Sequence, residues 1–298
     1  MSKQLIILTG PTGIGKTDLS LDLAQMLGTE IISCDSRQMY HQLKIGTAPP
    51  SHEQLQRVKH HFIGNLNVTD YYSAGRFELE VLDLLNSLFE KYTKVLMTGG
   101  STMYVDALVN GIDDLPSADL AIRQQVKSEM EEKGVAAMVD RLRIIDPEYC
   151  ETADLSNPRR VAKAMEIFLM TGRKYSSFRT ATAKQRDFEI HLIGLNMNRD
   201  ELYNRIDHRV DLMLEAGLEN EARQMYPYRE LNALNTVGYK EFFDYFDGQY
   251  DRDEAVRLIK RNSRRYAKRQ LSWFGRYPQM VWFDKSETDK LKNYVAQL

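Results

Sequence analysis

The chain has 298 residues, with 40 Lys and Arg against 42 Asp and Glu and with two cysteines, and these counts exclude several classes of protein. A chain of this length buries enough apolar surface for one large or two modest domains without a disulfide or metal framework. Two cysteines are too few for a secreted disulfide scaffold, and no apolar run approaches the roughly 20 residues that span a bilayer. The first strand begins by about Leu5, so we expect no targeting peptide and a cytoplasmic protein.

A phosphate-binding loop follows the first predicted strand. Its residues are Gly10, Pro11, Thr12, Gly13, Ile14, Gly15, Lys16 and Thr17, which match the G-x-x-x-x-G-K-[ST] pattern. Glycines let successive N–H groups point at one anion, Lys16 adds a positive charge, and the Thr17 hydroxyl is a candidate Mg²⁺ ligand. Because a helix predicted over residues 16–27 directs its positive end at this loop, we expect a di- or triphosphate to bind here.

Strands and helices alternate over the first 110 residues. We predict strands at 4–9, 30–34, 60–63 and 94–97, and helices at 16–27, 74–92 and 102–109. Between 113 and 187 only helices are predicted, at 119–133, 135–144 and 158–170. A strand at 189–195, helices at 199–216, 218–226, 238–246 and 253–274, and a strand at 280–283 complete the pattern.

This order predicts an α/β fold, namely a P-loop NTPase-like parallel sheet flanked by helices, with a helical insertion domain. The core domain would comprise residues 1–112 and 188–298, and the insertion residues 113–187.

An acidic residue stands where ligands bind in such sheets. Motors and switches carry Asp or Glu at the end of a second strand, where it holds magnesium. Here the strand at 94–97 ends in Thr98-Gly99-Gly100 without a carboxylate, so nucleotide hydrolysis is not expected. Asp35 instead follows the strand at 30–34, in the crevice at the carboxyl ends of the strands. The alternative is that Asp35 only caps a turn.

Positive charge is concentrated near the C-terminus. Residues 255–283 include eight Lys and Arg and no Asp or Glu, so the rest of the chain, with 32 basic and 42 acidic residues, has a net charge of −10. Along the helix predicted at 253–274, a basic stripe follows the helical repeat and lies opposite an inward face that includes Gln270. The stripe comprises Arg257, Lys260, Arg261, Arg264, Arg265 and Lys268. Because no acids are interleaved at i+4, the stripe favours contact with a polyanion over an ordinary solvated surface.

Several motifs together identify a family resemblance. Besides the loop at 10–17, they are the runs at 32–40 (which includes Asp35-Ser36-Arg37-Gln38), 45–48, 99–104, 115–119, 237–239 and 267–270. In this order, through nearly the whole chain, they closely resemble tRNA dimethylallyltransferases. Three positions depart from the family pattern: Ser101 stands for the usual Thr, Thr102 for a common Gly, and Pro49 for a common Lys.

The resemblance implies a reaction and its substrates. A dimethylallyl group would pass from dimethylallyl diphosphate to N6 of the adenosine just 3′ of the anticodon in tRNA, with release of diphosphate. The loop would hold the leaving diphosphate with Mg²⁺ as cofactor, and the catalytic residues would be Asp35 as general base, Ser101 and Lys16. We expect a monomer that binds the tRNA anticodon stem-loop and no membrane.

The resemblance also implies where tRNA binds. Asp35, Ser36, Arg37 and Gln38 would line the pocket for the base, together with Ser101. The anticodon stem-loop would contact Arg123 and the run Arg159, Arg160, Val161, Ala162 and Lys163. From the charge of the basic stripe, we also expect Arg264 and Lys268 to contact tRNA. Arg205 and Arg209, one helical turn apart, would reach the diphosphate, although an ordinary solvated pair is the alternative.

Three other functions remain open at this point. A P-loop small-molecule kinase would transfer phosphate from ATP and close lid arginines on the triphosphate. A prenyltransferase acting on free adenine nucleotides would need no long basic helix. A non-catalytic RNA-binding protein would carry a vestigial loop, which the intact Lys16-Thr17 pair and Asp35 disfavour.

Overall fold

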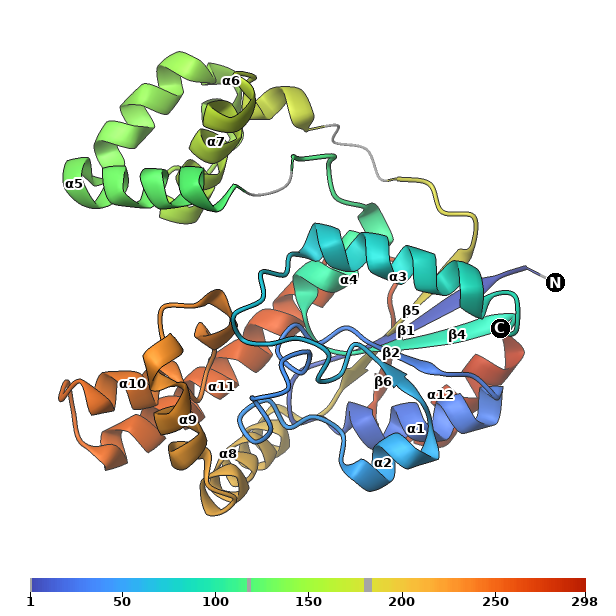
Figure 1. Cartoon of the computed structure of the whole chain (residues 1–298). Coiled ribbons are helices and arrows are strands. Elements are labelled where there is room, and N and C mark those ends of the chain that lie inside the picture. Colours follow the sequence, from blue (N-terminus) through green and yellow to red (C-terminus); the bar gives the residue numbers. More distant parts are fainter. Residues whose placement is uncertain (1, 117–118, 180–183) are drawn as a thin grey trace. The chain divides into compact units, whose positions relative to one another are not determined.

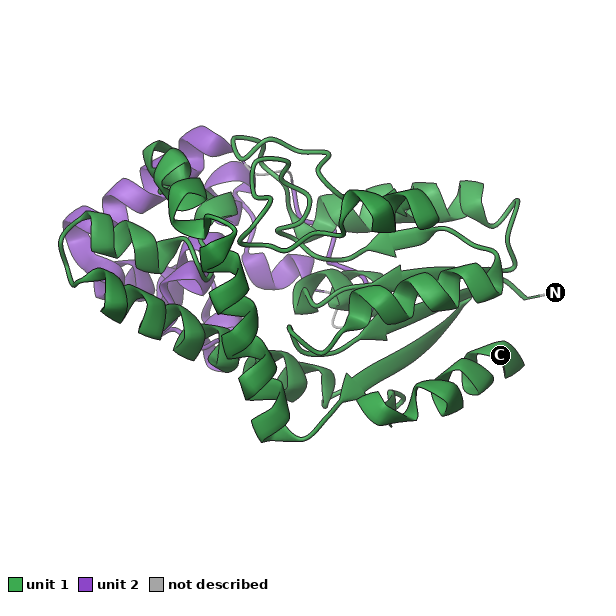
Figure 2. Cartoon of the chain, turned by 90° about the horizontal axis from the view of Figure 1, so that it is seen from below, with its two compact units in different colours: residues 1–109, 185–298 green, residues 110–184 purple. Residues whose placement is uncertain are grey.

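The computed structural model describes residues 2–116, 119–179 and 184–298. The chain divides into two compact units, Met1–Val109 with Gln185–Leu298, and Asn110–Lys184, which Figure 2 shows in two colours. The insertion predicted from sequence spans 113–187. Ser117 and Ala118, in the motif at 115–119, lie outside the described residues.

The first unit is built on a parallel sheet of six strands in the order β3-β2-β4-β1-β5-β6. The strands are β1 (Gln4–Thr9), β2 (Ile31–Ser33), β3 (His60–His61), β4 (Lys94–Thr98), β5 (Glu189–Asn196) and β6 (Val281–Asp284). Every residue of β1 is buried, as expected for a central parallel strand with helices on both faces. The predicted α/β class is therefore confirmed.

Helices cover both faces of this sheet. Figure 1 shows α1 (Lys16–Leu27) and α12 (Thr288–Gln297) on one face and α3 (Ala74–Leu88) and α4 (Thr102–Asn110) on the other. The remaining helices of the unit are α2 (His52–Arg57), α8 (Arg199–Glu215), α9 (Leu218–Met225), α10 (Lys240–Phe246) and α11 (Arg252–Phe274). Leu291 and Val295 of α12 join the core formed by β1 and α1.

The second unit has its own small core. It contains α5 (Leu120–Ile145), α6 (Pro147–Thr152) and α7 (Pro158–Thr171). α5 is interrupted at Gly134, whose φ is 80°, so the two helices predicted at 119–133 and 135–144 are both present. Asn157 caps α7 by accepting a hydrogen bond from the N–H of Arg159.

Three of the α-helices in the described residues were not predicted from the sequence: α2, α6 and α12. α2 and α6 have six residues each, which is too short for helical periodicity to show. No helix in the described part of the chain is long and apolar enough to cross a bilayer.

Candidate active site

The phosphate loop has the backbone shape that its sequence predicts. Gly13 and Gly15 have φ of 82° and 92°, a left-handed conformation that other residues rarely adopt, and α1 begins at the next residue, Lys16. Lys16 Nζ donates to the carbonyl oxygens of Gly10 and Pro11, at 2.9 Å each. Burial lowers the pKa of Lys16 to about 8, against the opposing effect of the nearby Asp35 carboxylate.

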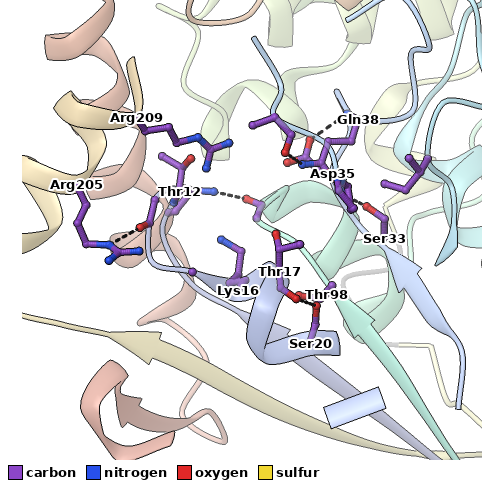
Figure 3. A pocket seen from close by; sticks show the side chains of 18 of the residues that line it. Thr12, Lys16, Thr17, Ser20, Ser33, Asp35, Gln38, Thr98, Arg205 and Arg209 are labelled. Atoms are coloured by element: carbon purple, nitrogen blue, oxygen red, sulfur yellow. Dashed lines mark hydrogen bonds between the residues drawn. The ribbon is translucent and has the colours of Figure 1, made fainter. Parts of the chain in front are cut away.

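A cavity of about 340 Å³ opens beside this loop, and all its lining residues belong to the first unit. The phosphate loop contributes Thr12, Gly13, Gly15, Lys16 and Thr17 to the lining. The segment after β2 contributes Asp35 and Gln38. Figure 3 shows Arg205 and Arg209 on one side, Asp35 and Gln38 on the other, and Lys16 and Thr17 between them. The structure thus brings the phosphate loop and Asp35, the predicted general base, into one cavity.

Asp35 both caps a turn and faces the cavity. Its Oδ1 accepts from the backbone N–H groups of Arg37 at 2.9 Å and Gln38 at 3.4 Å. Its Oδ2 has no hydrogen-bond partner among the described residues. The two interpretations of Asp35 are therefore compatible, because one oxygen holds the turn while the carboxylate lines the cavity.

Ser101 and Ser36 form a support behind Asp35. The Ser101 hydroxyl accepts from the Ser36 N–H at 2.8 Å and donates to Ser36 Oγ at 3.0 Å. Ser101 is buried, and neither serine is among the residues that line the cavity, nor is Arg37. In this structure the Ser101 hydroxyl ties the β4–α4 turn to the residue that follows Asp35.

Gln38 is oriented by a loop that the sequence did not connect to it. Its Nε2 donates to the carbonyl oxygens of Thr47 at 3.1 Å and Ala48 at 3.0 Å, so its Oε1 is the amide atom left for other contacts. Ala48 has a φ of 41°, an unfavourable conformation for a residue with a Cβ. The loop geometry is therefore enforced by its surroundings.

The loop at 44–48 is held in place by Glu221 of α9. Its buried carboxylate accepts from the N–H groups of Lys44, Ile45 and Gly46 at 2.8 to 3.1 Å. It also accepts from the Tyr239 hydroxyl at 2.6 Å. Glu221 was not predicted from the sequence because its three backbone partners lie more than 170 residues away. The motifs at 45–48 and 237–239 include two of its partner residues besides Gly46, namely Ile45 and Tyr239.

Two arginines of α8 line the cavity, and one of them contacts the phosphate loop. Arg205 Nε donates to the Gly13 carbonyl oxygen at 3.0 Å, and both Arg205 and Arg209 line the cavity. Burial lowers the pKa of Arg209, and the Asp35 carboxylate opposes this effect. Among the described residues, neither guanidinium has a carboxylate within ion-pair distance. Two cations that form no ion pair in the described chain and line a cavity beside a phosphate loop favour the diphosphate contact over the solvated pair.

Gln270 of α11 is a site residue that sequence analysis assigned only to packing. Its side chain is 2% exposed and lines the cavity. Oε1 accepts from the Thr12 N–H at 2.9 Å, and Nε2 donates to the Gly100 carbonyl oxygen at 2.8 Å. The helical repeat predicted that Gln270 faces inward, but not what it meets there.

Ion pairs neutralise more of the positive charge of the basic stripe than the sequence suggests. Lys260 pairs with Asp211 at 2.6 Å, Arg264 with Asp207 at 2.5 Å, and Arg257 with Glu254 at 2.6 Å. The expectation of a stripe without acidic partners is therefore wrong for these three residues, because α8 and the first turn of α11 supply the acids. Arg265, Lys268 and Arg269 are exposed.

In the second unit, the residues predicted to contact tRNA differ in exposure. Arg159 and Arg160 are exposed, Ala162 and Lys163 are half-buried, and Val161 is fully buried in the unit's core. Val161 cannot therefore contact RNA through its side chain. Arg123 forms a two-point ion pair with the carboxylate of Glu166, at 3.2 and 3.3 Å.

The site's fit for magnesium depends on the phosphates. Among the described residues no group of three or more His, Cys, Asp and Glu side chains could hold a metal ion. The Thr17 hydroxyl lines the cavity and has no hydrogen-bond partner in the described chain. Mg²⁺ typically takes one or two protein ligands together with substrate phosphates and water, and these residues fit that arrangement.

A parallel sheet whose phosphate loop opens into a cavity shared with a carboxylate is the arrangement of the P-loop class of proteins, in which ligands bind at the carboxyl ends of the strands. The family model described as IPP transferase matches residues 38–277. A tRNA dimethylallyltransferase 2 of Porphyromonas gingivalis is 54% identical over 286 residues, which cover 96% of this chain and 95% of that protein. A tRNA dimethylallyltransferase 1 of Phocaeicola vulgatus is 50% identical over 295 residues, 99% of this chain and 98% of that protein.

Solved structures agree with the sequence relatives. The full-length tRNA isopentenylpyrophosphate transferase of Bacillus halodurans has a TM-score of 0.71 and 35% identity, covering 99% of this chain and 96% of that one. A eukaryotic dimethylallyltransferase acting on tRNA has a TM-score of 0.81 and 25% identity, covering 99% and 77%. The chain belongs to the IPP transferase family, which confirms the resemblance.

Proposed function

We propose that the chain transfers a dimethylallyl group from dimethylallyl diphosphate to N6 of the adenosine on the 3′ side of the anticodon in tRNA, and releases diphosphate. The observation that carries this proposal is the shared cavity, into which the phosphate loop and Asp35 both open. The names of the close relatives support tRNA as the acceptor.

The phosphate side of the cavity suits a departing diphosphate. When the allylic C–O bond breaks, its electron pair leaves with the diphosphate, whose negative charge increases. The loop N–H groups other than that of Thr12, together with Lys16 and the α8 arginines, lie beside the cavity and would stabilise this charge. Mg²⁺, held by the Thr17 hydroxyl and the phosphates, would add further positive charge when bound.

The other side suits a weak nitrogen nucleophile. The N6 lone pair forms the new C–N bond, and N6 must lose one proton as it does so. Asp35 accepts that proton on Oδ2, the oxygen that the turn does not use. Because Oδ1 is held by two backbone N–H groups, the carboxylate keeps its orientation during the reaction.

The target base lies within a stacked loop, so it must turn out of the stack to reach Asp35. In our proposal Asp35 and Gln38 contact the base, supported by Ser36, Arg37 and Ser101. Arg123 and the exposed part of 159–163 contact the anticodon stem-loop, and Lys268 with Arg264 adds phosphate contacts. The protein would act as a monomer in the cytoplasm.

A single mixing experiment tests this function. The protein, Mg²⁺ and unmodified tRNA are incubated with dimethylallyl diphosphate, and mass spectrometry of the digested RNA is expected to find a dimethylallyl group on the adenosine next to the anticodon. The same tRNA with guanosine at that position is the control. Parallel reactions with ATP or with free AMP as acceptor test the kinase and the nucleotide prenyltransferase. Phosphate transfer from ATP, or modification of AMP in place of tRNA, would contradict the proposal.

A further inference from the structure

The N–H group of Thr12 in the phosphate loop is already occupied by a hydrogen bond within the protein. Thr12 N–H donates to Gln270 Oε1 at 2.9 Å. Its neighbours differ, because the N–H groups of Gly13, Gly15 and Lys16 have no acceptor among the described residues. Those later N–H groups are free to bind an anion. At Thr12, by contrast, an anion would meet the amide oxygen of Gln270, which is an acceptor, in place of an N–H donor.

The Gln270 amide cannot turn over to change this. Nε2 donates to the Gly100 carbonyl oxygen at 2.8 Å, and reversing the amide would bring oxygen against oxygen there and nitrogen against N–H at Thr12. A Cβ on Gly100 would lie 2.2 Å from Nε2, so only glycine admits the amide at this place. The side chain is 2% exposed, so water does not readily replace either contact.

The orientation has a consequence for polyphosphates. P-loop proteins that bind triphosphates use the loop N–H groups and the lysine for the last two phosphates. Phosphate oxygens only accept hydrogen bonds, and an amide oxygen beside them is repulsive. We propose that Gln270 is a specificity-determining residue, which limits the phosphate cradle to two phosphoryl groups by occupying the N–H of Thr12. This inference rests on the proposed function, in which the cradle holds a diphosphate.

The test compares two inorganic probes, pyrophosphate and tripolyphosphate, by calorimetric titration of the full-length protein at fixed Mg²⁺ and pH. The wild type is expected to bind pyrophosphate at least about tenfold more tightly than tripolyphosphate, a factor that corresponds to about 1.4 kcal/mol of binding free energy. Gln270→Ala frees the Thr12 N–H and is expected to reduce this preference about tenfold. A merely structural role would weaken both probes alike and leave their ratio unchanged.

Asn262→Ala is the matched control. Asn262 is a half-buried amide on the same helix, and its Nδ2 donates to Glu241 at 2.7 Å, away from the cavity lining. Its loss is expected to leave the ratio of the two affinities unchanged.

A measurement on the wild type keeps the inference testable if the variant does not fold. In amide hydrogen exchange, pyrophosphate is expected to protect Gly13 to Thr17 while Thr12 is protected with or without the anion. New protection of Thr12 on adding pyrophosphate would overturn the inference. Equal wild-type affinities for the two probes, or an unchanged preference in Gln270→Ala, would also overturn it and leave the proposed function standing. A wild type that binds no pyrophosphate would refute the proposed function itself.

Discussion

The two sides of the cavity are built in different ways. The backbone of the phosphate side is formed by consecutive residues from Thr12 to Thr17, whose shape follows from local glycines and the start of α1. The opposite side depends on contacts between distant segments: Ser36 with Ser101, and the loop at 44–48 with both Gln38 and Glu221. A local motif therefore shapes the backbone on the phosphate side, whereas contacts between distant segments orient Asp35 and Gln38 on the other side.

The largest effect is expected from a substitution that distinguishes the roles of the two carboxylate oxygens of Asp35. Asp35→Asn keeps an oxygen to accept from the N–H groups of Arg37 and Gln38, but it removes the proton acceptor. We expect single-turnover transfer to fall about 10²- to 10⁴-fold while tRNA affinity changes little. Asp35→Ala also loses the turn and is expected to be at least as impaired. An Asn variant with wild-type turnover would remove Asp35 from its role as base.

The distant support of the opposite side is tested at Glu221. Glu221→Ala leaves three backbone N–H groups and the Tyr239 hydroxyl without their acceptor. We expect the free energy of unfolding to fall by about 3 kcal/mol, measured by urea denaturation. Glu219→Ala on the same helix removes only ion pairs to exposed arginines and is expected to change it by less than about 1 kcal/mol. Equal losses in the two variants would mean that Glu221 has no special supporting role.

The phosphate side is tested through pH. Burial lowers the Lys16 pKa to about 8, so above this pH the free protein increasingly loses the ammonium charge. An anion binds the charged form, so binding takes up a proton and affinity falls with rising pH, by at most about tenfold per unit. The measurement is the pyrophosphate dissociation constant between pH 7 and 9.5. Lys16→Met corrects for the titration of pyrophosphate itself, and parallel curves for the two proteins would contradict the prediction.

The smallest expected effect lies outside both sides of the cavity. Lys268 is exposed, whereas Arg264 is held by Asp207. Lys268→Gln is expected to weaken tRNA binding a few-fold and to reduce the salt slope of its affinity by about 1. Arg264→Gln is expected to reduce the slope less, because its charge is already neutralised in the fold. A salt slope that Lys268→Gln leaves unchanged would mean that this surface does not contact phosphates.

The same contrast explains what could be predicted from the sequence. The parallel sheet, the loop at 10–17 and the position of Asp35 follow from short-range patterns, because apolar runs and glycines determine them locally. Glu221 and the Gln270 amide were not predicted, because their roles depend on partners 175 and 258 residues away. The positive charge of the basic stripe was overestimated for a related reason. Asp207 and Asp211, which neutralise part of it, lie on α8 and not on the same helix.

The backbone bond between Lys184 N–H and the Asn110 carbonyl oxygen, at 2.8 Å, has a consequence for the architecture. It holds the chain leaving β4 and α4 next to the chain returning to β5, so the helical unit begins and ends at nearly one point. A segment with adjacent ends can change in length or be exchanged as a cassette without altering the register of the flanking strands. Such a cassette can therefore change while the cavity stays the same, because every residue that lines the cavity belongs to the first unit.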